Sequence, residues 1–344
     1  MTDTMEQPNK PLNHLKFLNH IKTDHLPTEL TFGSECSGIE APYQALSLLG
    51  INVKHLFACE IDTHACKSIE ANYSPVTMYK DITTRDPAVL PHVDLYVAGF
   101  PCQSFSVIGT CKGFDSASGT IFFNCLQTIQ STRPKCFILE NVKGLTTHDK
   151  GNTFATVMAC LNELSDYYIH HSVYNTKHYG LPQNRERVYI VGMSKEYFNE
   201  GFTKPNVIPL ETSLWDIVDR DNTTESVLTP HKQRVLDEFV SDGLRGCKVD
   251  PSEPWMLNLN ASSVNEYLSP MNGLCSCLLA NGSEKYFTPL KRYLTAREVI
   301  RLQGFPDTFK QVVSDRQFKK QAGNSMSTNV LCAIISSIYL NCKG

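Results

Sequence analysis

The chain has 344 residues and a formal net charge of −3, with 41% apolar and 19% charged residues. These proportions are those of an ordinary globular protein and exclude a disordered or fibrous one. The length leaves room for one large domain and a smaller one. Because the net charge is negative, any basic surface that binds nucleic acid is expected to be local.

No run of the sequence reaches the roughly 20 apolar residues of a membrane span, and the polar start MTDTMEQPNK lacks the apolar stretch of a secretory signal. The thirteen cysteines are therefore expected to be reduced thiols of an intracellular protein. Neither Cys59/Cys66 nor Cys275/Cys277 has the spacing of a structural zinc site, so no metal is expected.

The first part of the chain predicts an extension followed by alternating strands and helices. Residues 1–28 are polar and show no clear period, which predicts a loosely ordered segment. From Glu29, the run ELTFGSECSGIEAPYQALSLLG predicts a strand, a turn with Gly38 and a helix ending at Gly50. The runs VKHLFACEID, VDLYVAGF, KCFILENV and RVYIVGM predict further strands. This order indicates an α/β fold with a doubly wound parallel sheet that binds ligands at the carboxyl ends of its strands.

After about residue 195 the period fades into a region rich in proline, asparagine and serine, which holds Trp215 and Trp255. This change predicts a second, smaller and more irregular domain. Helical patterns return in LTAREVIRLQGFPD, where Thr295 and Glu298 fit a capping box, and in NSMSTNVLCAIISSIYL.

Residues with chemical potential follow the predicted strands. Cys102 in GFPCQSFS lies in a polar loop after a strand, and its thiol, with a reference pKa of roughly 8.5, needs local activation to act as a nucleophile. An inert packed thiol is the alternative. Glu140 ends a buried strand, which favours a functional carboxyl over a helix-capping acid. Arg185 and Arg187 alternate and would point to one face, as in an ordinary charge ladder or in a site.

Five segments in order resemble the motifs of cytosine-5 DNA methyltransferases. They are GFPCQSFS at 99–106, ENV at 140–142, QNRERVYIVG at 183–192, LTAREVIRLQGFPD at 294–307 and AGNSMSTNV at 322–330. The resemblance covers nearly everything from Thr31 onward except the stretch near 200–270. It implies a catalytic and S-adenosylmethionine-binding domain over 29–198, completed by 320–344, and a small target-recognition domain over 199–319.

The resemblance also implies a role for each matching residue. The Cys102 thiolate would attack carbon 6 of a flipped cytosine, with Glu140 bonding ring nitrogen 3 and Arg185 and Arg187 assisting. Glu60 would bind the cofactor ribose, and Asp81 the adenine amine. The implied cofactor residues are Gly38, Ile39, Glu60, Ile61, Asp81, Ile82, Gly99, Pro101, Asn324 and Ser325. The implied DNA contacts are Gln103, Ser104, Ser106, Gln183 and Cys277.

The expected partner is double-stranded DNA, bound by a monomer. The target base must leave the duplex, so the loop from Ser104 to about Gly119 would close over it while the small domain reads the sequence. The setting stays open between a bacterial cytoplasm, with or without a restriction partner, and the nucleus or cytoplasm of a eukaryotic or viral system.

Three residues depart from the resembled pattern. Cys36 replaces an aromatic residue near the adenine, Ser118 replaces an arginine, and Cys277 replaces a threonine that contacts the DNA backbone.

Other activities are weighed against DNA methylation. A related enzyme of transfer RNA would carry a Cys-Phe-Thr tripeptide, which is missing. A silent DNA-binding relative would have lost the thiol, the acid or an arginine. A nicotinamide-dependent oxidoreductase would need a tighter glycine fingerprint.

Overall fold

A seven-stranded sheet forms the larger part of the computed structural model, which describes residues 13–101, 121–242, 249–260, 270–280 and 284–343. Its strand order is β3-β2-β1-β4-β5-β8-β6. The strands are β1 (Glu29–Glu35), β2 (Asn52–Cys59), β3 (Thr77–Tyr79), β4 (Leu95–Ala98), β5 (Cys136–Val142), β6 (Tyr167–Asn175) and β8 (Glu186–Ser194).

The first five strands run parallel, and of these β1, β2, β4 and β5 were predicted and β3 was not. In contrast, β8 pairs antiparallel with both β5 and β6. The expectation that RVYIVGM continues a parallel sheet is therefore wrong. A parallel return needs a crossover of a dozen or more residues, and the link between β6 and β8 is shorter than that.

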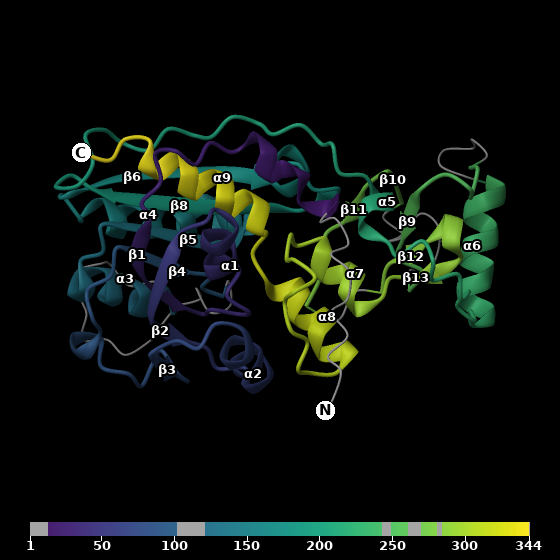
Figure 1. The fold of residues 1–344 in the computed structure, drawn as a ribbon, viewed down its shortest axis with the longest axis horizontal. Coiled ribbons are helices and arrows are strands. Elements are labelled where there is room, and N and C mark those ends of the chain that lie inside the picture. The colour runs from purple at the N-terminus through teal and green to yellow at the C-terminus, as the bar shows by residue number, and fades with distance from the viewer. Residues whose placement is uncertain (1–12, 102–120, 243–248, 261–269, 281–283, 344) are drawn as a thin grey trace, which may run out of the picture.

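Helices cover both faces of this sheet, and alternate residues of each strand face opposite layers. In β5, Cys136 and Ile138 share one core with α1 (Ala41–Leu48) and α9 (Thr328–Tyr339), whereas Phe137 and Leu139 share another with α3 (Ile121–Thr132) and α4 (Asn152–Asn162). The helix α2 (Thr63–Asn72) connects β2 to β3. The last helix thus returns to the large sheet, beside α1 (Figure 1).

A smaller part of the molecule lies beside the large sheet (Figure 1). It contains an antiparallel sheet of order β10-β9-β12-β13, with β9 (Trp255–Leu257), β10 (Met271–Asn272), β12 (Tyr286–Phe287) and β13 (Arg292–Tyr293). Its helices are α5 (Leu214–Ile217), α6 (Pro230–Asp242) and α7 (Ala296–Arg301), and α8 (Asp315–Asn324) follows them and leads to α9. The short strand β11 (Cys275–Ser276) pairs with β7 (Gln183–Asn184) and joins the two parts. The predicted capping box of Thr295 and Glu298 is confirmed at the start of α7.

The segment after residue 12 is packed, which contradicts the expectation of a loose extension for residues 13–28. The 3₁₀ helix η1 (Asn13–His20) buries Leu15 and Phe17 in the main core. Its His14 ring nitrogen Nε2 lies 2.9 Å from the carbonyl oxygen of Phe305. Leu18, Ile21 and Leu26 also pack against this core, so a few apolar side chains spread over a polar run anchor it, and composition alone hides such an anchor. Among the described helices, none is long and apolar enough to cross a membrane.

Candidate active site

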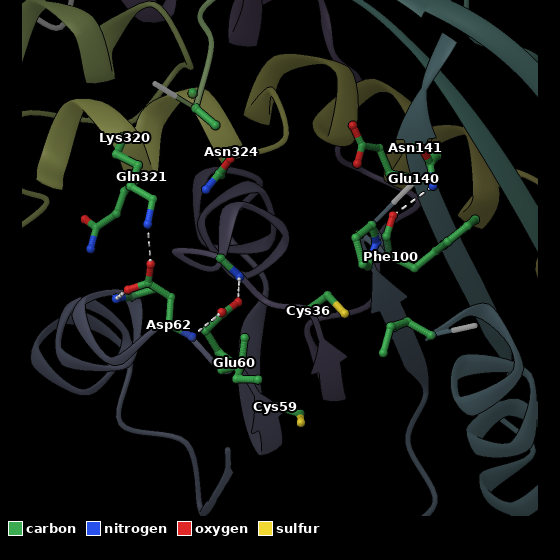
Figure 2. Close-up of a pocket in the computed structure, with 18 of the residues that line it drawn as sticks. Cys36, Cys59, Glu60, Asp62, Phe100, Glu140, Asn141, Lys320, Gln321 and Asn324 are labelled. Atoms are coloured by element: carbon green, nitrogen blue, oxygen red, sulfur yellow. Dashed lines mark hydrogen bonds and ion pairs between the residues drawn. The ribbon is translucent and has the colours of Figure 1, made fainter. Parts of the chain in front are cut away.

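A pocket of about 650 Å³ opens at the carboxyl ends of the parallel strands, the edge where the sequence predicts ligands. Loops after β1, β2 and β4 and the end of β5 form one side, and α8 closes the other (Figure 2). Eleven of the predicted site residues line it: Gly38, Glu60, Ile61, Asp81, Ile82, Gly99, Pro101, Glu140, Arg185, Arg187 and Asn324.

Four predicted residues lie elsewhere. Ile39 belongs to the main core, and Ser325 is buried behind the pocket wall. Gln183 is fully buried, and its amide nitrogen donates to the carbonyl oxygen of Leu302 at 2.8 Å, so it holds the two parts of the molecule together rather than facing DNA. Cys277 is half-buried beside the two arginines. Cys102, Gln103, Ser104, Ser106 and Ser118 lie outside the described residues, and Pro101 is the last described residue before them.

Glu60 is held rigidly at the floor of the pocket. Its two carboxylate oxygens accept the backbone N–H groups of Gly38 at 2.7 Å and Asp62 at 2.8 Å (Figure 2). Gly38 has a φ of 58°, a left-handed conformation that glycine adopts without strain. Burial raises the pKa of Glu60, and the backbone hydrogen bonds oppose this shift. The carboxylate keeps lone pairs free to accept hydroxyl groups of a ligand.

Asp81 lies at the outer end of the pocket. One of its oxygens accepts the backbone N–H and the hydroxyl of Thr83, at 2.8 and 2.7 Å. These bonds lower the pKa of Asp81, so the carboxylate stays ionised and able to accept from an amine. Cys36 also lines this pocket, and burial raises the pKa of its thiol well above the usual range. It is therefore a neutral packing group where the resembled family places an aromatic ring.

Glu140 and Arg187 form an ion pair at the opposite side of the pocket. Oε1 of Glu140 lies 3.2 Å from Nε of Arg187, and both side chains are largely buried. Burial raises the pKa of Glu140, and the two neighbouring guanidinium groups oppose this shift. Next to it, the Asn141 amide donates to the carbonyl oxygen of Phe100 at 2.8 Å, which ties β5 to the backbone that leads into Cys102 (Figure 2).

Arg185 has a different environment from Arg187. It is 2% exposed, and its guanidinium donates to the carbonyl oxygens of Leu278, Gly323 and Ser325 at 2.9, 3.1 and 2.7 Å. Burial lowers its pKa. Both arginines reach the pocket as predicted, but Arg185 fastens three backbone segments, whereas Arg187 holds the carboxyl group.

Lys320 lines the pocket although no role was predicted for it, and residues 278–280, which directly follow the predicted Cys277, line it as well. The Lys320 ammonium lies 2.9 Å from Oδ2 of Asp62, which also caps α2 (Figure 2). A signal for Lys320 existed: it precedes Asn324 by four residues, so a helix there puts both on one face. Within the described residues, no cluster of histidine, cysteine and carboxylate side chains could hold a metal ion.

Comparisons with known proteins agree with this geometry. Residues 30–340 match the sequence profile of the family described as C-5 cytosine-specific DNA methylase. Type II methyltransferase M.HaeII of Haemophilus aegyptius is 38% identical over 288 residues, which cover 83% of this chain and 86% of that protein. Type II methyltransferase M.HpaII of Haemophilus parainfluenzae is 34% identical over 334 residues, covering 90% and 89%.

The fold has a counterpart among solved structures. The S. pombe Dnmt2 methyltransferase superposes with a TM-score of 0.64 at 19% identity, over 90% of this chain and 97% of that one. At this identity the likeness concerns the fold alone. The profile match and the two relatives over most of the chain decide the assignment, and the chain belongs to the family of C-5 cytosine-specific DNA methylases.

Proposed function

We propose that this DNA cytosine-5 methyltransferase uses Cys102 as its nucleophile and Glu140 as its acid in a sequence-specific modification of double-stranded DNA. One observation carries the proposal: the Glu140–Arg187 pair opens into the same pocket as Glu60 and Asp81. A base bound at the ion pair and a cofactor bound at the two acids would share one cavity. The relatives named above are Type II methyltransferases, which supports a modification enzyme.

The chemistry needs a nucleophile and an acid on the same base. The Cys102 thiolate adds to carbon 6 of cytosine, and Glu140 donates a hydrogen bond or proton to ring nitrogen 3, which takes up the charge. Carbon 5 would then take the methyl group as the bond from that group to the cofactor sulfur breaks and S-adenosylhomocysteine is left. The carbon 5 proton would pass to a solvent base, and the electron pair of the C–H bond would expel the Cys102 thiolate from carbon 6. Arg187 supports this step by orienting the Glu140 carboxyl group.

S-adenosylmethionine supplies the methyl group as an electrophile when it is bound. The pocket volume lies within the range of small-molecule sites. Glu60 would accept the ribose hydroxyls, and Asp81 would accept the adenine amine with the oxygen that does not bond Thr83. Ile61, Ile82, Gly99, Pro101 and Asn324 would complete the walls. Ile39 and Ser325 would act from behind, because both are buried.

DNA would bind between the two parts of the molecule. We assign residues 29–198 and 320–344 to the catalytic domain and 199–319 to the target-recognition domain, which the separate small sheet supports. Gln103, Ser104 and Ser106 would contact the flipped nucleotide. Cys277 is half-buried beside Arg185, so it would contact the backbone of the flipped nucleotide only at its exposed edge. We expect a monomer that acts inside the cell, where its DNA substrate is.

Transfer of a labelled methyl group from S-adenosylmethionine tests the proposal, with unmethylated DNA and transfer RNA as substrates and bisulfite sequencing of the DNA. We expect label in DNA only, and none with Cys102→Ala. The matched control is Cys342→Ala, which removes an exposed thiol far from the pocket and should leave the rate unchanged.

DNA carrying 5-fluorocytosine provides a second readout, because carbon 5 cannot lose fluorine as it loses a proton. The native enzyme should remain covalently attached to it on a denaturing gel, and Cys102→Ala should not. Activity in Cys102→Ala equal to that of the native chain would refute the nucleophile. Label confined to transfer RNA would refute the substrate.

A further inference from the structure

A buried carboxylate lies beneath the pocket, outside the residues used above. Glu35 ends β1 and is fully buried, and it forms an ion pair with Arg85, whose side chain is 3% exposed. Its second oxygen accepts the hydroxyls of Tyr96 at 2.6 Å and Thr128 at 2.9 Å. The Arg85 guanidinium also donates to the Thr128 hydroxyl.

These partners belong to three segments whose neighbouring residues line the pocket. Glu35 directly precedes Cys36, in the turn that leads to Gly38. Arg85 ends the turn begun by Asp81, whose carbonyl oxygen accepts the backbone N–H of Arg85 at 3.3 Å. Thr128 lies in α3, the helix whose first residue, Ile121, lines the pocket. A single carboxylate therefore links the glycine turn, the Asp81 turn and α3.

The burial of both charges points to a geometric role. Removing two charges from water costs several kcal/mol per ion, and apolar residues of similar volume often stabilise a fold as well or better. Such a pair is weak evidence for stability. Apolar contacts do not depend on direction, whereas a guanidinium group bonds a carboxylate only in a few orientations. The pair therefore fixes the position of the turn that carries Arg85.

We propose that the Glu35–Arg85 pair is a positioning device that holds the Asp81 turn at the distance from the Gly38–Glu60 wall that S-adenosylmethionine requires. The inference rests on the proposed cofactor role of this pocket. Glu35 and Arg85 do not contact the reacting atoms. They act through Asp81 and Gly38, so they should control cofactor affinity and leave the methyl-transfer step itself unchanged.

The test compares Glu35→Gln and Arg85→Lys with Glu29→Gln. Glu35→Gln keeps the shape but places an amide against the guanidinium, and Arg85→Lys keeps the charge but cannot reach both Glu35 and Thr128. Glu29 begins the same strand and pairs with Lys54 at 2.6 Å on the surface, so its loss is the matched control. Calorimetry measures S-adenosylhomocysteine binding, and steady-state kinetics separate kcat from KM.

Because the Asp81 turn would lose its fixed position, we expect Kd for S-adenosylhomocysteine and KM for S-adenosylmethionine to rise about tenfold or more in both variants. The kcat at saturating cofactor should stay near that of the native enzyme, and Glu29→Gln should change neither constant.

A purely structural pair predicts a lower melting temperature in Arg85→Lys at an unchanged Kd, and that result would overturn the inference. If Glu35→Gln does not fold, Arg85→Lys alone decides the test, because it keeps a positive charge opposite the buried Glu35 carboxylate. Failure of the native enzyme to bind S-adenosylhomocysteine would instead refute the proposed function.

Discussion

Arg185 and Arg187, which alternate in the sequence, have different partners in the structure. Arg187 is 16% exposed at its side chain and faces Glu140, so it can respond to a bound base. Arg185 saturates three backbone carbonyl oxygens and is closed off from solvent. An alternating pattern predicts the shared face but not the partner of each side chain. The difference arises because Arg185 meets segments some 90 to 140 residues further along the chain.

The environment of Glu140 predicts a pH dependence. Burial raises its pKa, so the protonated form that donates to ring nitrogen 3 persists to a higher pH than for an exposed glutamate. The contribution of protonated Glu140 to kcat should be fully present below that raised pKa and should be lost as pH rises through it. Formation of the Cys102 thiolate has the opposite effect, because it raises kcat as pH increases. The native profile of kcat against pH should therefore be bell-shaped.

Glu140→Gln separates these two limbs. The amide does not titrate, so the falling limb should disappear and only the rising thiol limb remain. General acid catalysis typically contributes 10² to 10⁴-fold, so kcat should drop by about 100-fold or more. Glu186→Gln, which alters an exposed surface pair with Lys143, is the control. A falling limb that survives in Glu140→Gln would assign it to another group.

Site residues that follow strands could be predicted from the sequence, and those that depend on distant partners could not. Glu60 and Glu140 were found because a carboxyl group after a buried apolar run is placed at the ligand edge of the sheet. Glu35 looked like part of a turn, because its partner Arg85 is 50 residues away. The pair of Lys320 with Asp62 was hidden in the same way, since Asp62 precedes it by 258 residues, although the spacing of Lys320 from Asn324 was a usable signal.

At the scale of elements, the parallel strands β1, β2, β4 and β5 carried clear signals, whereas the short β3 and the longer β6 did not. Its sequence YYIHHSVYN has a mixed burial pattern with both faces partly covered, so neither alternation nor a continuous apolar run marks it. The missing strand also explains the wrong direction expected for β8. Because the sequence does not reveal β6 as the antiparallel partner of β8, a parallel crossover from β5 to β8 was the default expectation.

The contact of α8 with the segment 278–280 depends on a glycine. A Cβ atom at Gly323 would lie 2.2 Å from the carbonyl oxygen of Leu279, a backbone atom that cannot move alone. Gly323→Ala gains about 1 kcal/mol of helix propensity. Overpacking costs about 1–3 kcal/mol, and a clash at this distance belongs at the upper end. We therefore expect net destabilisation and a wider pocket.

Urea denaturation and KM for S-adenosylmethionine measure these two effects. Gly323→Ala should lower the midpoint and raise KM, because Gly323, Asn324 and Leu279 all line the pocket. Gly201→Ala is the matched control, since a Cβ there meets Tyr168 at an ordinary 3.6 Å. A midpoint raised by Gly323→Ala would mean that helix propensity outweighs the clash.

At the scale of the whole molecule, the two parts share one core. The cluster that contains α1 and α9 continues through Phe305 and Leu294 to Phe287 and Met256 of the small sheet. Hydrogen bonds add to this continuity: the Gln183 amide of the large part donates to the carbonyl oxygen of Leu302 in the small part at 2.8 Å. A change of texture near residue 195 predicts two domains from composition. It gives no sign of this shared core, which forms from residues distant in the sequence.

A shared core predicts that the molecule unfolds as one cooperative unit. Ile334 is fully buried in α9, and truncating an isoleucine in such a core costs about 2–5 kcal/mol.

Both tryptophans, Trp215 and Trp255, lie on the side of the small sheet and report on that part. In Ile334→Ala, the urea midpoint followed by tryptophan fluorescence should fall together with that followed by far-ultraviolet circular dichroism. Leu340→Ala, at an exposed position just beyond the helix, should change the free energy of unfolding by no more than about 0.5 kcal/mol with either signal. If the fluorescence midpoint stayed at its native value while the dichroism midpoint fell, the small sheet would be an independent folding unit, and the shared core would be an interface between two domains rather than the centre of one.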